Sequence, residues 1–418
     1  MSVTMYAVSG VGSNSNSGST ASSTPKASGA GAVTASGSTT VTLSANTPDL
    51  STVVAGDTIR LNARTDGKNG SDIFEITGVN DGLDTVTVTP TPNTTTSGVT
   101  WAIGGAFATA AKLVFSASAG DTLYCKGIFN ESIDMVGAAA NGSIMANGDP
   151  ANAFPRLIGY SVTPGDNGMA IFDSNNTKSN CISLVNNSNY WSFENIRITR
   201  FTGQGFRYAF ASFSTRFVHC EVDHCGGTLA FGVPNNSTVI DCYAHDNTGH
   251  GFEATEMSYF ANCISVLNSG VGFYGGGGNH YFNCLSKANL IAGFHQNDDL
   301  NHKSLMLFNC LVDGSGITQT GVRISDDAQV RQAILTNNIV INCISGIVGQ
   351  SDNGLFNNSY NNLVYNCSTA RVNFSDVSGS VTGVPLFVDE DALDYTPVTG
   401  GAQIGAGFDM SLSSWISF

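Results

Sequence analysis

A cysteine recurs at nearly constant intervals through the second half of the chain. From Cys220 to Cys367 the cysteines of this series lie 22, 21, 21, 26, 33 and 24 residues apart, with Cys225 outside the series. Each follows an Asn, Asp or His, in the stretches FVHCEV, VIDCYA, FANCIS, FNCLSK, FNCLVD, VINCIS and VYNCST. A repeat of about 20 to 30 residues that holds two or three short strands is typical of a solenoid, in which each coil packs on its neighbours.

A second motif, a glycine before a phenylalanine, alternates with these stretches as GQGF, GHGF, GVGF and AGF. In a parallel β-helix each coil lies about 4.8 Å above the previous one, so equivalent residues form columns. We expect the aromatic column to fill the interior and the cysteines to form a second interior column of reduced thiols, because side chains that point the same way rarely reach disulfide geometry. The residues before the cysteines are expected to face inward and to bond along the axis. The aromatic column is Phe206, Phe231, Phe252, Phe273 and Phe294.

Composition excludes several classes of function. Charged residues make up only 12% of the chain and glycine is abundant, with 48 residues, which suits turn-rich β structure. The net charge of −15 is spread along the chain, which argues against nucleic acid and against an anionic membrane surface. No apolar run approaches the length of about 18 residues that a transmembrane helix needs, and the N-terminus lacks the pattern of a Sec signal.

Composition also divides the chain. Residues 1–45 are dominated by Ser, Gly, Ala and Thr, which predicts a flexible segment or, alternatively, an attachment arm. Residues 46–103 contain short alternating stretches such as DIFEITGV and predict a small β module. A short amphipathic helix is expected over residues 107–115, at the start of a β-helix spanning residues 104–410, with residues 411–418 as a tail.

Residues 104–410 resemble the right-handed parallel β-helix superfamily of pectate-lyase-like proteins. The resemblance includes a first segment, GGAFATAAKLVFSASAGDTLYCKGIFNESI, that is similar to the family's capping helix and first coil, and a final segment, PLFVDEDALDYTPVTGGAQIGAGFD, that is similar to its last coil. It implies an all-β, right-handed parallel β-helix solenoid behind a small N-terminal β module. The family includes lyases, hydrolases, epimerases and non-enzymatic virion proteins, so it specifies architecture better than activity.

Strand alternation predicts an outward column directly after the inward phenylalanines. This column contains Glu253, Tyr274, His295 and, across a longer coil, Arg323, while the following loops contain Glu256, Asp298 and Asp299. The glycines at residues 275–278 would leave one coil bare between longer loops. We therefore expect a notch with these polar side chains on its rim.

Two interpretations of the notch stay open. As a carbohydrate site it would have Glu253, Glu256, Tyr274, His295 and Asp298 as candidate catalytic residues, through paired carboxylates or through a Tyr or His base. Sugar contacts would come from Tyr274, His295, Asp299 and Arg323. Alternatively these are ordinary solvated turn residues and the glycines form a tight corner. The seven histidines show no compact ligand spacing, so no metal site and no cofactor are predicted, with calcium held by Asp298 and Asp299 as an alternative.

The segment TVTVTPTP…TTTSGVTWAIGG is similar to segments of phage-encoded proteins. The first hypothesis for function is therefore a virion structural protein of a bacteriophage, assembled in the host cytoplasm. It would be a homotrimeric capsid decoration or tail spike that contacts other virion proteins through residues 1–103 and host surface glycans through its β-helix. The alternative is a polysaccharide-degrading enzyme, a lyase or glycoside hydrolase, either free or as a tailspike depolymerase.

Overall fold

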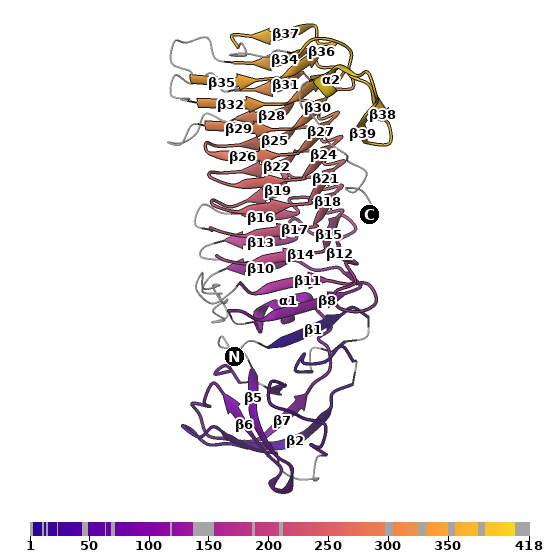
Figure 1. Cartoon of the computed structure of the whole chain (residues 1–418). Helices are drawn as coiled ribbons and strands as arrows, with labels where there is room; N and C mark the ends of the chain where they lie inside the picture. Colours follow the sequence, from indigo (N-terminus) through magenta and orange to yellow (C-terminus); the bar gives the residue numbers. More distant parts are fainter. Residues whose placement is uncertain are drawn as a thin grey trace. The chain divides into compact units, whose positions relative to one another are not determined.

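The computed structural model of the chain consists almost entirely of short β-strands (Figure 1). Among the described residues, no helix is long and apolar enough to cross a membrane. The chain forms two compact units: unit 1 comprises residues 1–174, 181–197 and 210–212, and unit 2 comprises residues 175–180, 198–209 and 213–418. The structure describes residues 3–10, 12–13, 16–22, 24–43, 49–62, 64–67, 72–117, 119–136, 154–185, 189–208, 212–296, 304–317, 319–324, 332–349, 356–374 and 381–405.

Unit 1 contains a small closed barrel, which confirms the predicted N-terminal β module. Its apolar core includes Val41, Ile59, Phe74 and Val86, each at most 1% exposed. Around the barrel the strand order is β2 (Ala27–Thr34), β3 (Thr40–Leu43), β6 (Thr85–Thr89), β5 (Ile73–Asn80), β4 (Thr58–Leu61) and β7 (Thr96–Ile103), with the 3-10 turn η2 (Asp81–Leu83) between β5 and β6.

The expectation of a flexible segment over residues 1–45 is wrong for the described part of it. Strands β2 and β3 belong to the barrel, and β1 (Thr4–Val8) pairs in parallel with β8 (Thr122–Lys126). Met5 and Ala7 of β1 are fully buried, because their alternation in TMYAV points both side chains inward. The Ser-rich surroundings of these strands concealed that alternation.

Helix α1 (Ala110–Phe115) is shorter than the predicted helix over residues 107–115. It begins after Thr109, whose side chain accepts a hydrogen bond from the Lys112 amide. The Glu131 carboxylate accepts hydrogen bonds from the amides of Ala110 and Ala111 at 2.6 and 3.1 Å, so the exposed donors of the first turn are satisfied.

The remaining strands of unit 1 form the first coils of a parallel β-helix. Strand β8 pairs with β11, β11 with β14, β9 with β12, and β10 with β13, all in parallel. Strand β15 (Ile196–Thr199) runs from unit 1 into unit 2. The bounds are β9 (Ile128–Phe129), β10 (Ile133–Val136), β11 (Arg156–Gly159), β12 (Ala170–Asp173), β13 (Ile182–Val185) and β14 (Ser192–Glu194).

Unit 2 contains three parallel sheets, which confirms the predicted β-helix solenoid. Sheet one is β16 (Phe206–Tyr208), β19 (Leu229–Val233), β22 (His250–Ala254), β25 (Val271–Gly275), β28 (Ala292–Gln296), β31 (Thr320–Arg323), β34 (Ser345–Val348) and β37 (Thr369–Val372). Sheet two is β17 (Arg216–Val218), β20 (Thr238–Ile240), β23 (Tyr259–Ala261), β26 (Asn279–Phe282), β29 (Ser304–Phe308), β32 (Gln332–Thr336) and β35 (Phe356–Tyr360). Sheet three is β18 (Glu221–Asp223), β21 (Tyr243–His245), β24 (Ile264–Val266), β27 (Leu285–Lys287), β30 (Leu311–Asp313), β33 (Ile339–Ile341) and β36 (Leu363–Tyr365).

Both predicted interior columns are present. The phenylalanine rings from Phe206 to Phe294 stack with centroids 5.0, 4.9, 5.0 and 4.7 Å apart. All ten cysteines are free thiols, and nine of them are buried. Burial of these apolar side chains in every coil supplies the main stabilisation of the solenoid.

The residues before the cysteines do not face inward as predicted. They lie at a corner with φ between 50° and 57°, and each is partly or fully exposed. Asn, Asp and His are favoured there because they tolerate the left-handed conformation. The predicted bonding along the axis does occur, since Asn262 Nδ2 donates to Asp241 Oδ1 at 3.0 Å. The seven residues are His219, Asp241, Asn262, Asn283, Asn309, Asn342 and Asn366.

The buried amide ladder belongs to a different column. Asn247 Nδ2 donates to Asn268 Oδ1, and Asn268 Nδ2 donates to Asn289 Oδ1, each at 2.9 Å. The glycines of the Gly-Phe motif make room for this ladder: a Cβ at Gly272 would lie 2.7 Å from Asn289 Nδ2. The repeated glycine is therefore a packing requirement of the interior.

Among the described residues, β37 is the last strand of sheet one, and the segment expected to form the last coil contributes a parallel bridge from Val381 to Leu363 and then a hairpin. Strands β38 (Phe387–Asp389) and β39 (Asp394–Pro397) form an antiparallel hairpin, followed by α2 (Ala402–Gly405). The fully buried Tyr395 packs with apolar residues of sheet three such as Leu285 and Leu311. Its hydroxyl donates to Asp313 Oδ2 at 2.7 Å, so the hairpin is held against the side of sheet three.

Candidate functional site

The strand register places the predicted outward column on sheet one. Glu253 is paired with Tyr274, Tyr274 with His295, and His295 with Arg323 on successive strands. All four side chains are partly exposed. The structure therefore brings these four predicted residues together as one continuous column.

Glu253 is held by a residue that the sequence did not indicate. The Tyr208 hydroxyl donates to Glu253 Oε1 at 3.0 Å, although Glu253 lies two coils further along sheet one. Gly232 occupies the coil between them, and a Cβ there would lie 2.6 Å from Tyr208 Cδ1. Burial raises the pKa of Glu253, and the hydrogen bond from Tyr208 offsets part of that rise.

Aromatic side chains adjoin this carboxyl group. The His250 and Tyr274 rings stack with centroids 4.5 Å apart, and the His295 ring meets Tyr274 edge-on at 5.3 Å. The Val271 amide donates to His250 Nδ1 at 2.9 Å, and burial lowers the pKa of His250. His250 is therefore held as a neutral ring with Nδ1 as the acceptor.

The four glycines form a tight corner next to this column. A Cβ at Gly276 would lie 2.1 Å from the Thr255 carbonyl oxygen, and Gly278 has φ of 80°. The Asn279 side chain secures the turn, because its Nδ2 donates to Gly276 O and its Oδ1 accepts from the Ser258 amide, each at 2.9 Å. Glu256 lies partly exposed in the preceding coil. Asp298 and Asp299 lie outside the described residues, and so do the calcium site and the far rim of the notch predicted from them.

One polar group beside the corner is unusual. Gln296 is 1% exposed and is paired in register with Gly275, yet neither polar atom of its carboxamide has a hydrogen-bond partner among the described residues. A buried amide without partners is costly and usually marks a place that a water or a ligand atom occupies. No sequence signal singles out Gln296, because a glutamine at the end of a strand is usually exposed.

A second polar cluster lies on sheet three. Glu221 and Asp223 of β18 and His245 of β21 have ligand-capable atoms that all lie within 4.8 Å of one another. His245 Nε2 lies 3.2 Å from Glu221 Oε1, and His245 Nδ1 lies 2.7 Å from Asp246 Oδ2. The three side chains could hold a metal ion, whereas the sequence analysis predicted no metal site because the histidines lack a compact spacing.

The register of the repeat contained the missing signal. Glu221 and Asp223 occupy the first and third positions after Cys220, and Tyr243 and His245 occupy the same positions after Cys242. Strand pairing places Asp223 opposite His245. The clue was therefore the spacing between columns, since no contiguous motif joins the three residues.

Burial sets the electrostatics of this cluster. Asp223 is fully buried and Glu221 is 8% exposed. Burial by itself would lower the pKa of His245, but hydrogen bonds to Glu221 and Asp246 outweigh it and raise that pKa. In the absence of a metal ion, the neighbouring carboxylates thus favour the protonated form of His245.

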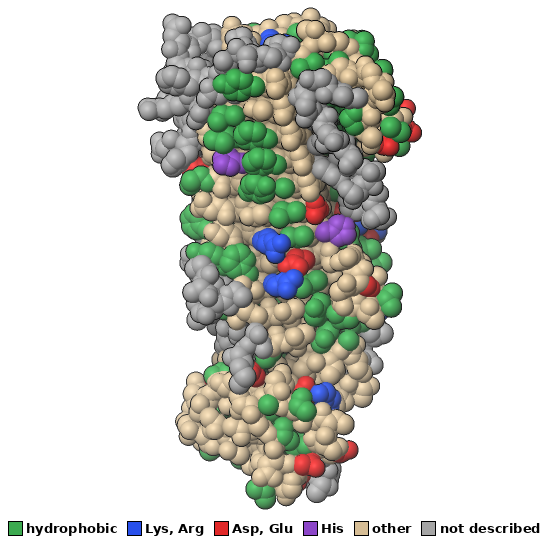
Figure 2. Space-filling view, viewed as in Figure 1, with side chains coloured by type: hydrophobic (Ala, Val, Ile, Leu, Met, Phe, Trp, Pro, Cys, Tyr) green, Lys and Arg blue, Asp and Glu red, His purple; other side chains and the backbone are tan. Residues whose placement is uncertain are grey.

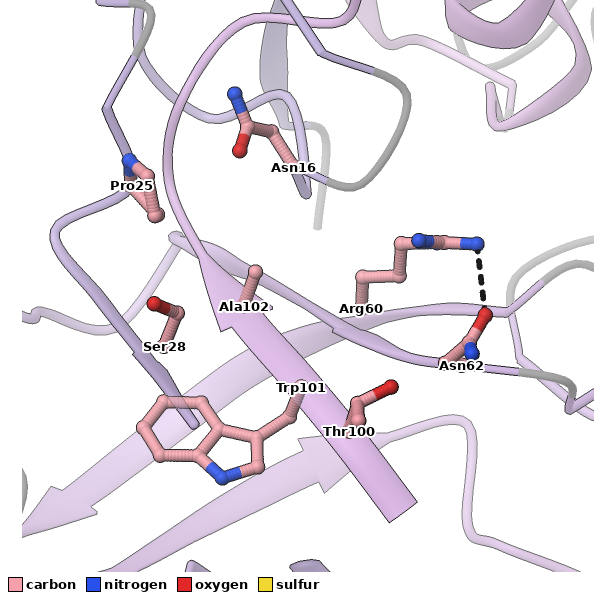
Figure 3. Close-up of a pocket in the computed structure, with 8 residues that line it drawn as sticks. All are labelled: Asn16, Pro25, Ser28, Arg60, Asn62, Thr100, Trp101 and Ala102. Atoms are coloured by element: carbon pink, nitrogen blue, oxygen red, sulfur yellow. Dashed lines mark hydrogen bonds between the residues drawn. The ribbon is translucent and has the colours of Figure 1, made fainter. Parts of the chain in front are cut away.

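Each unit has a hollow near polar side chains that bears on the candidate sites. In unit 2, a hollow of about 500 Å³ has His224 and Asp246 in its wall and opens beside the sheet-three cluster. In unit 1, a hollow of about 470 Å³ lies on the barrel. Figure 3 shows the hydrogen bond from Arg60 to Asn62 on one side of this hollow, and the Trp101 indole directed away from both residues. Its full lining is Asn16, Pro25, Ser28, Arg60, Asn62, Thr100, Trp101 and Ala102.

Sheet two has an apolar outer surface. The Tyr259, Phe282 and Phe308 rings stack along three successive coils, with centroids 5.0 and 4.9 Å apart. Figure 2 shows hydrophobic side chains gathered over this part of unit 2. Tyr259 is 39% exposed, so the stripe is accessible to a partner.

No protein-family model matches the chain, and none of the curated proteins matches it. Among solved structures, it is similar to pectate lyase Pel9A, with 14% identity, a TM-score of 0.45, and coverage of 71% of this chain and 81% of that one. The AlgE4 A-module, a mannuronan C-5 epimerase of Azotobacter vinelandii, gives 12% identity, a TM-score of 0.40, and coverage of 63% and 91%. ORF18 of Geobacillus virus E2 gives 13% identity, a TM-score of 0.25, and coverage of 60% of this chain and 51% of that one. At such identities a likeness concerns the fold at most and says nothing of activity.

Proposed function

We propose that the outer surface of sheet one around Glu253 binds a surface glycan. The observation that carries this proposal is the Tyr208–Glu253 hydrogen bond, which lies beside the stacked rings of His250 and Tyr274. A sugar presents apolar C–H faces and hydroxyl edges, and its binding sites combine aromatic rings with a few fixed polar groups. Arg323, in the same column as His295, adds a cation that suits an acidic sugar.

The test is binding of the purified full chain to a panel of capsular and lipopolysaccharide glycans. We expect Tyr274→Ala and Glu253→Gln each to weaken binding by about tenfold, the equivalent of one lost ring or charged contact. Tyr365→Ala is the matched control, because Tyr365 is an exposed tyrosine on sheet three. Equal binding by Tyr274→Ala and the unaltered chain would refute the site.

Cleavage of the bound glycan is the second candidate function. The raised pKa of Glu253 favours it, because burial that shifts a carboxyl toward its protonated form suits a general acid. Tyr274, which is paired in register with Glu253, and His295 on the next strand are the predicted bases of the same column. The test measures the release of reducing ends, or the ultraviolet absorbance of unsaturated uronates. Activity that is lost in Glu253→Gln but kept in Tyr365→Ala would establish a depolymerase. If glycans bind but are not cleaved, the chain is a recognition protein.

The proposed location is a bacteriophage virion, with the chain as a homotrimer attached to other virion proteins through residues 1–103. The similarity of the barrel sequence to segments of phage-encoded proteins supports the location. The apolar stripe on sheet two supports self-association, because a row of stacked, partly exposed aromatic rings gains by burial against a second copy. Light scattering of the full chain tests the trimer: Phe282→Ser should yield monomers, and a monomeric unaltered chain would contradict it.

A further inference from the structure

We propose that Glu221, Asp223 and His245 bind one divalent transition-metal ion, with Asp246 as the residue that positions the imidazole. The three donors come from β18 and β21, adjacent strands of one parallel sheet, so the backbone fixes their separation. Their ligand-capable atoms lie within 4.8 Å of one another, a span that one ion can bridge. Two carboxylates and an imidazole are a donor set suited to ions such as Zn²⁺, Mn²⁺ or Co²⁺.

The orientation of His245 supports metal binding. Its Nδ1 lies 2.7 Å from Asp246 Oδ2, so a proton on Nδ1 is held by that carboxylate. The other nitrogen, Nε2, lies 3.2 Å from Glu221 Oε1, and when an ion displaces the proton from Nε2 its lone pair is directed at the same place as that carboxylate. A carboxylate bonded to the far nitrogen of a ligating histidine is the usual arrangement in metal sites, where it fixes the tautomer and the ring orientation.

The environment of Asp223 supports it as well. Asp223 is fully buried, its Oδ1 accepts from the Thr199 hydroxyl at 2.6 Å, and His224 Nδ1 lies 2.6 Å from the same oxygen. These contacts fix the carboxylate in place before any ion arrives. Two buried carboxylates side by side need a cation, and a divalent ion on His245 Nε2 serves this need better than the single proton it would displace.

The site also has a route for an ion. Asp246 is 41% exposed and lines the hollow of about 500 Å³, together with His224. Three protein ligands leave coordination positions for water on that side, as in metal sites that stay open to small molecules. This cluster lies on sheet three and Glu253 lies on sheet one. A result that refutes the metal site therefore leaves the proposed glycan site untouched, and a result that refutes the glycan site leaves the metal site untouched.

The experiment uses the full chain, stripped with a chelator and kept reduced without added thiols. Calorimetric titration with Zn²⁺ should show one site per chain, and Co²⁺ should give visible d–d absorption typical of oxygen and nitrogen ligands. His245→Gln and Glu221→Gln should abolish this site. Asp246→Asn should weaken binding by about 10- to 100-fold while the Co²⁺ spectrum is kept, because it removes only the partner of Nδ1.

His280→Gln is the control, since His280 lies partly exposed on sheet two and has no contact with the cluster. Zn²⁺ should raise the melting temperature of the unaltered chain and of His280→Gln. If His245→Gln fails to fold, Asp246→Asn and the Co²⁺ spectrum decide the question. Absence of a saturable site, a thiolate-type Co²⁺ spectrum, or equal loss in His280→Gln would overturn the proposal.

Discussion

The Tyr208 hydroxyl and the Glu253 carboxylate are joined by a 3.0 Å hydrogen bond although 45 residues separate them. The bond spans two coils of sheet one, and it can form because Gly232 leaves the intermediate coil without a side chain. One glycine of the repeat thus determines where a half-buried acid is held on the outer surface. The column that the alternation predicts becomes a candidate site only through this longer-range contact.

Gly232→Ala should break this contact. The new Cβ would lie 2.6 Å from Tyr208 Cδ1 and 2.8 Å from the Phe206 carbonyl oxygen, so the tyrosine ring must move. We expect a loss of about 1 to 3 kcal/mol in the free energy of unfolding, measured by urea titration, as is typical of overpacking. Gly82→Ala, where only the Asn80 side chain lies within 4 Å, is the control and should be neutral. If Gly232→Ala does not change the free energy of unfolding, the Tyr208 side chain can adopt another rotamer without cost.

Glu253→Gln should alter the pH dependence of stability. Because burial raises the folded-state pKa of Glu253 above 4.5, its protonated form stabilises the fold at low pH. That contribution is complete below the unfolded-state pKa and is lost as the pH rises through the folded-state pKa. As the pH rises through the folded-state pKa of Glu253, the urea midpoint of the unaltered chain should therefore fall relative to the midpoint of Glu253→Gln. Parallel curves for the two proteins would show that Glu253 titrates normally.

His245 should give a related dependence in the metal-free protein. Its folded-state pKa is raised above 6.5 by Glu221 and Asp246, so the protonated ring stabilises the fold below pH 6.5. This stabilisation should disappear as the pH rises through the folded-state pKa, and His245→Gln should lack it. Thermal melts across neutral pH, with chelator present, measure the difference. A difference that grows with rising pH would have the wrong sign and refute the ion pairing.

Cys367 should be the thiol that reacts first in the folded chain. It is the partly exposed cysteine among the ten, and a hydrogen bond from Cys343 lowers its pKa to about 7. The thiolate is the reactive form, so alkylation by iodoacetamide should accelerate as the pH rises through neutrality. Intact-mass analysis should find one adduct per native chain. Cys367→Ser should remove it and Cys310→Ser should not; labelling that persists in Cys367→Ser would contradict the assignment.

Gln296→Met should be neutral or stabilising, by up to about 1 kcal/mol, because it removes a buried carboxamide that has no partner. The side chains are of similar length, so the packing opposite Gly275 should survive. Calorimetric melting measures the effect, with Gln204→Met on the partly exposed loop before β16 as a control. A clear destabilisation by Gln296→Met would indicate that the amide binds an ordered water that the fold requires.

The repeat allowed the central architecture to be predicted from sequence. Cysteine spacing and the Gly-Phe motif identified the solenoid, and the order of residues after each phenylalanine placed Glu253, Tyr274, His295 and Arg323 in one column. In-register parallel coils make this possible, because a fixed period converts sequence position directly into spatial position.

Corner geometry and edge pairing could not be predicted in the same way. The residues before the cysteines were expected inside, but positive φ turns their side chains outward. Strand β1 was taken for part of a flexible segment because five residues in Ser-rich surroundings give a weak pattern, and its partner β8 is more than a hundred residues away. The C-terminal hairpin, likewise, depends on an apolar surface of sheet three that only the folded coils create.

Period and alternation, both readable in the amino-acid sequence, fix the repeat, its phenylalanine and cysteine columns, and the outward column on sheet one. Only the tertiary structure decided which polar groups meet. Tyr208 reaches Glu253, and His245 meets Glu221 and Asp223, because side chains extend across coils and corners in directions that register does not specify. Their burial, which sets their charge, depends in turn on the neighbours that folding brings around them.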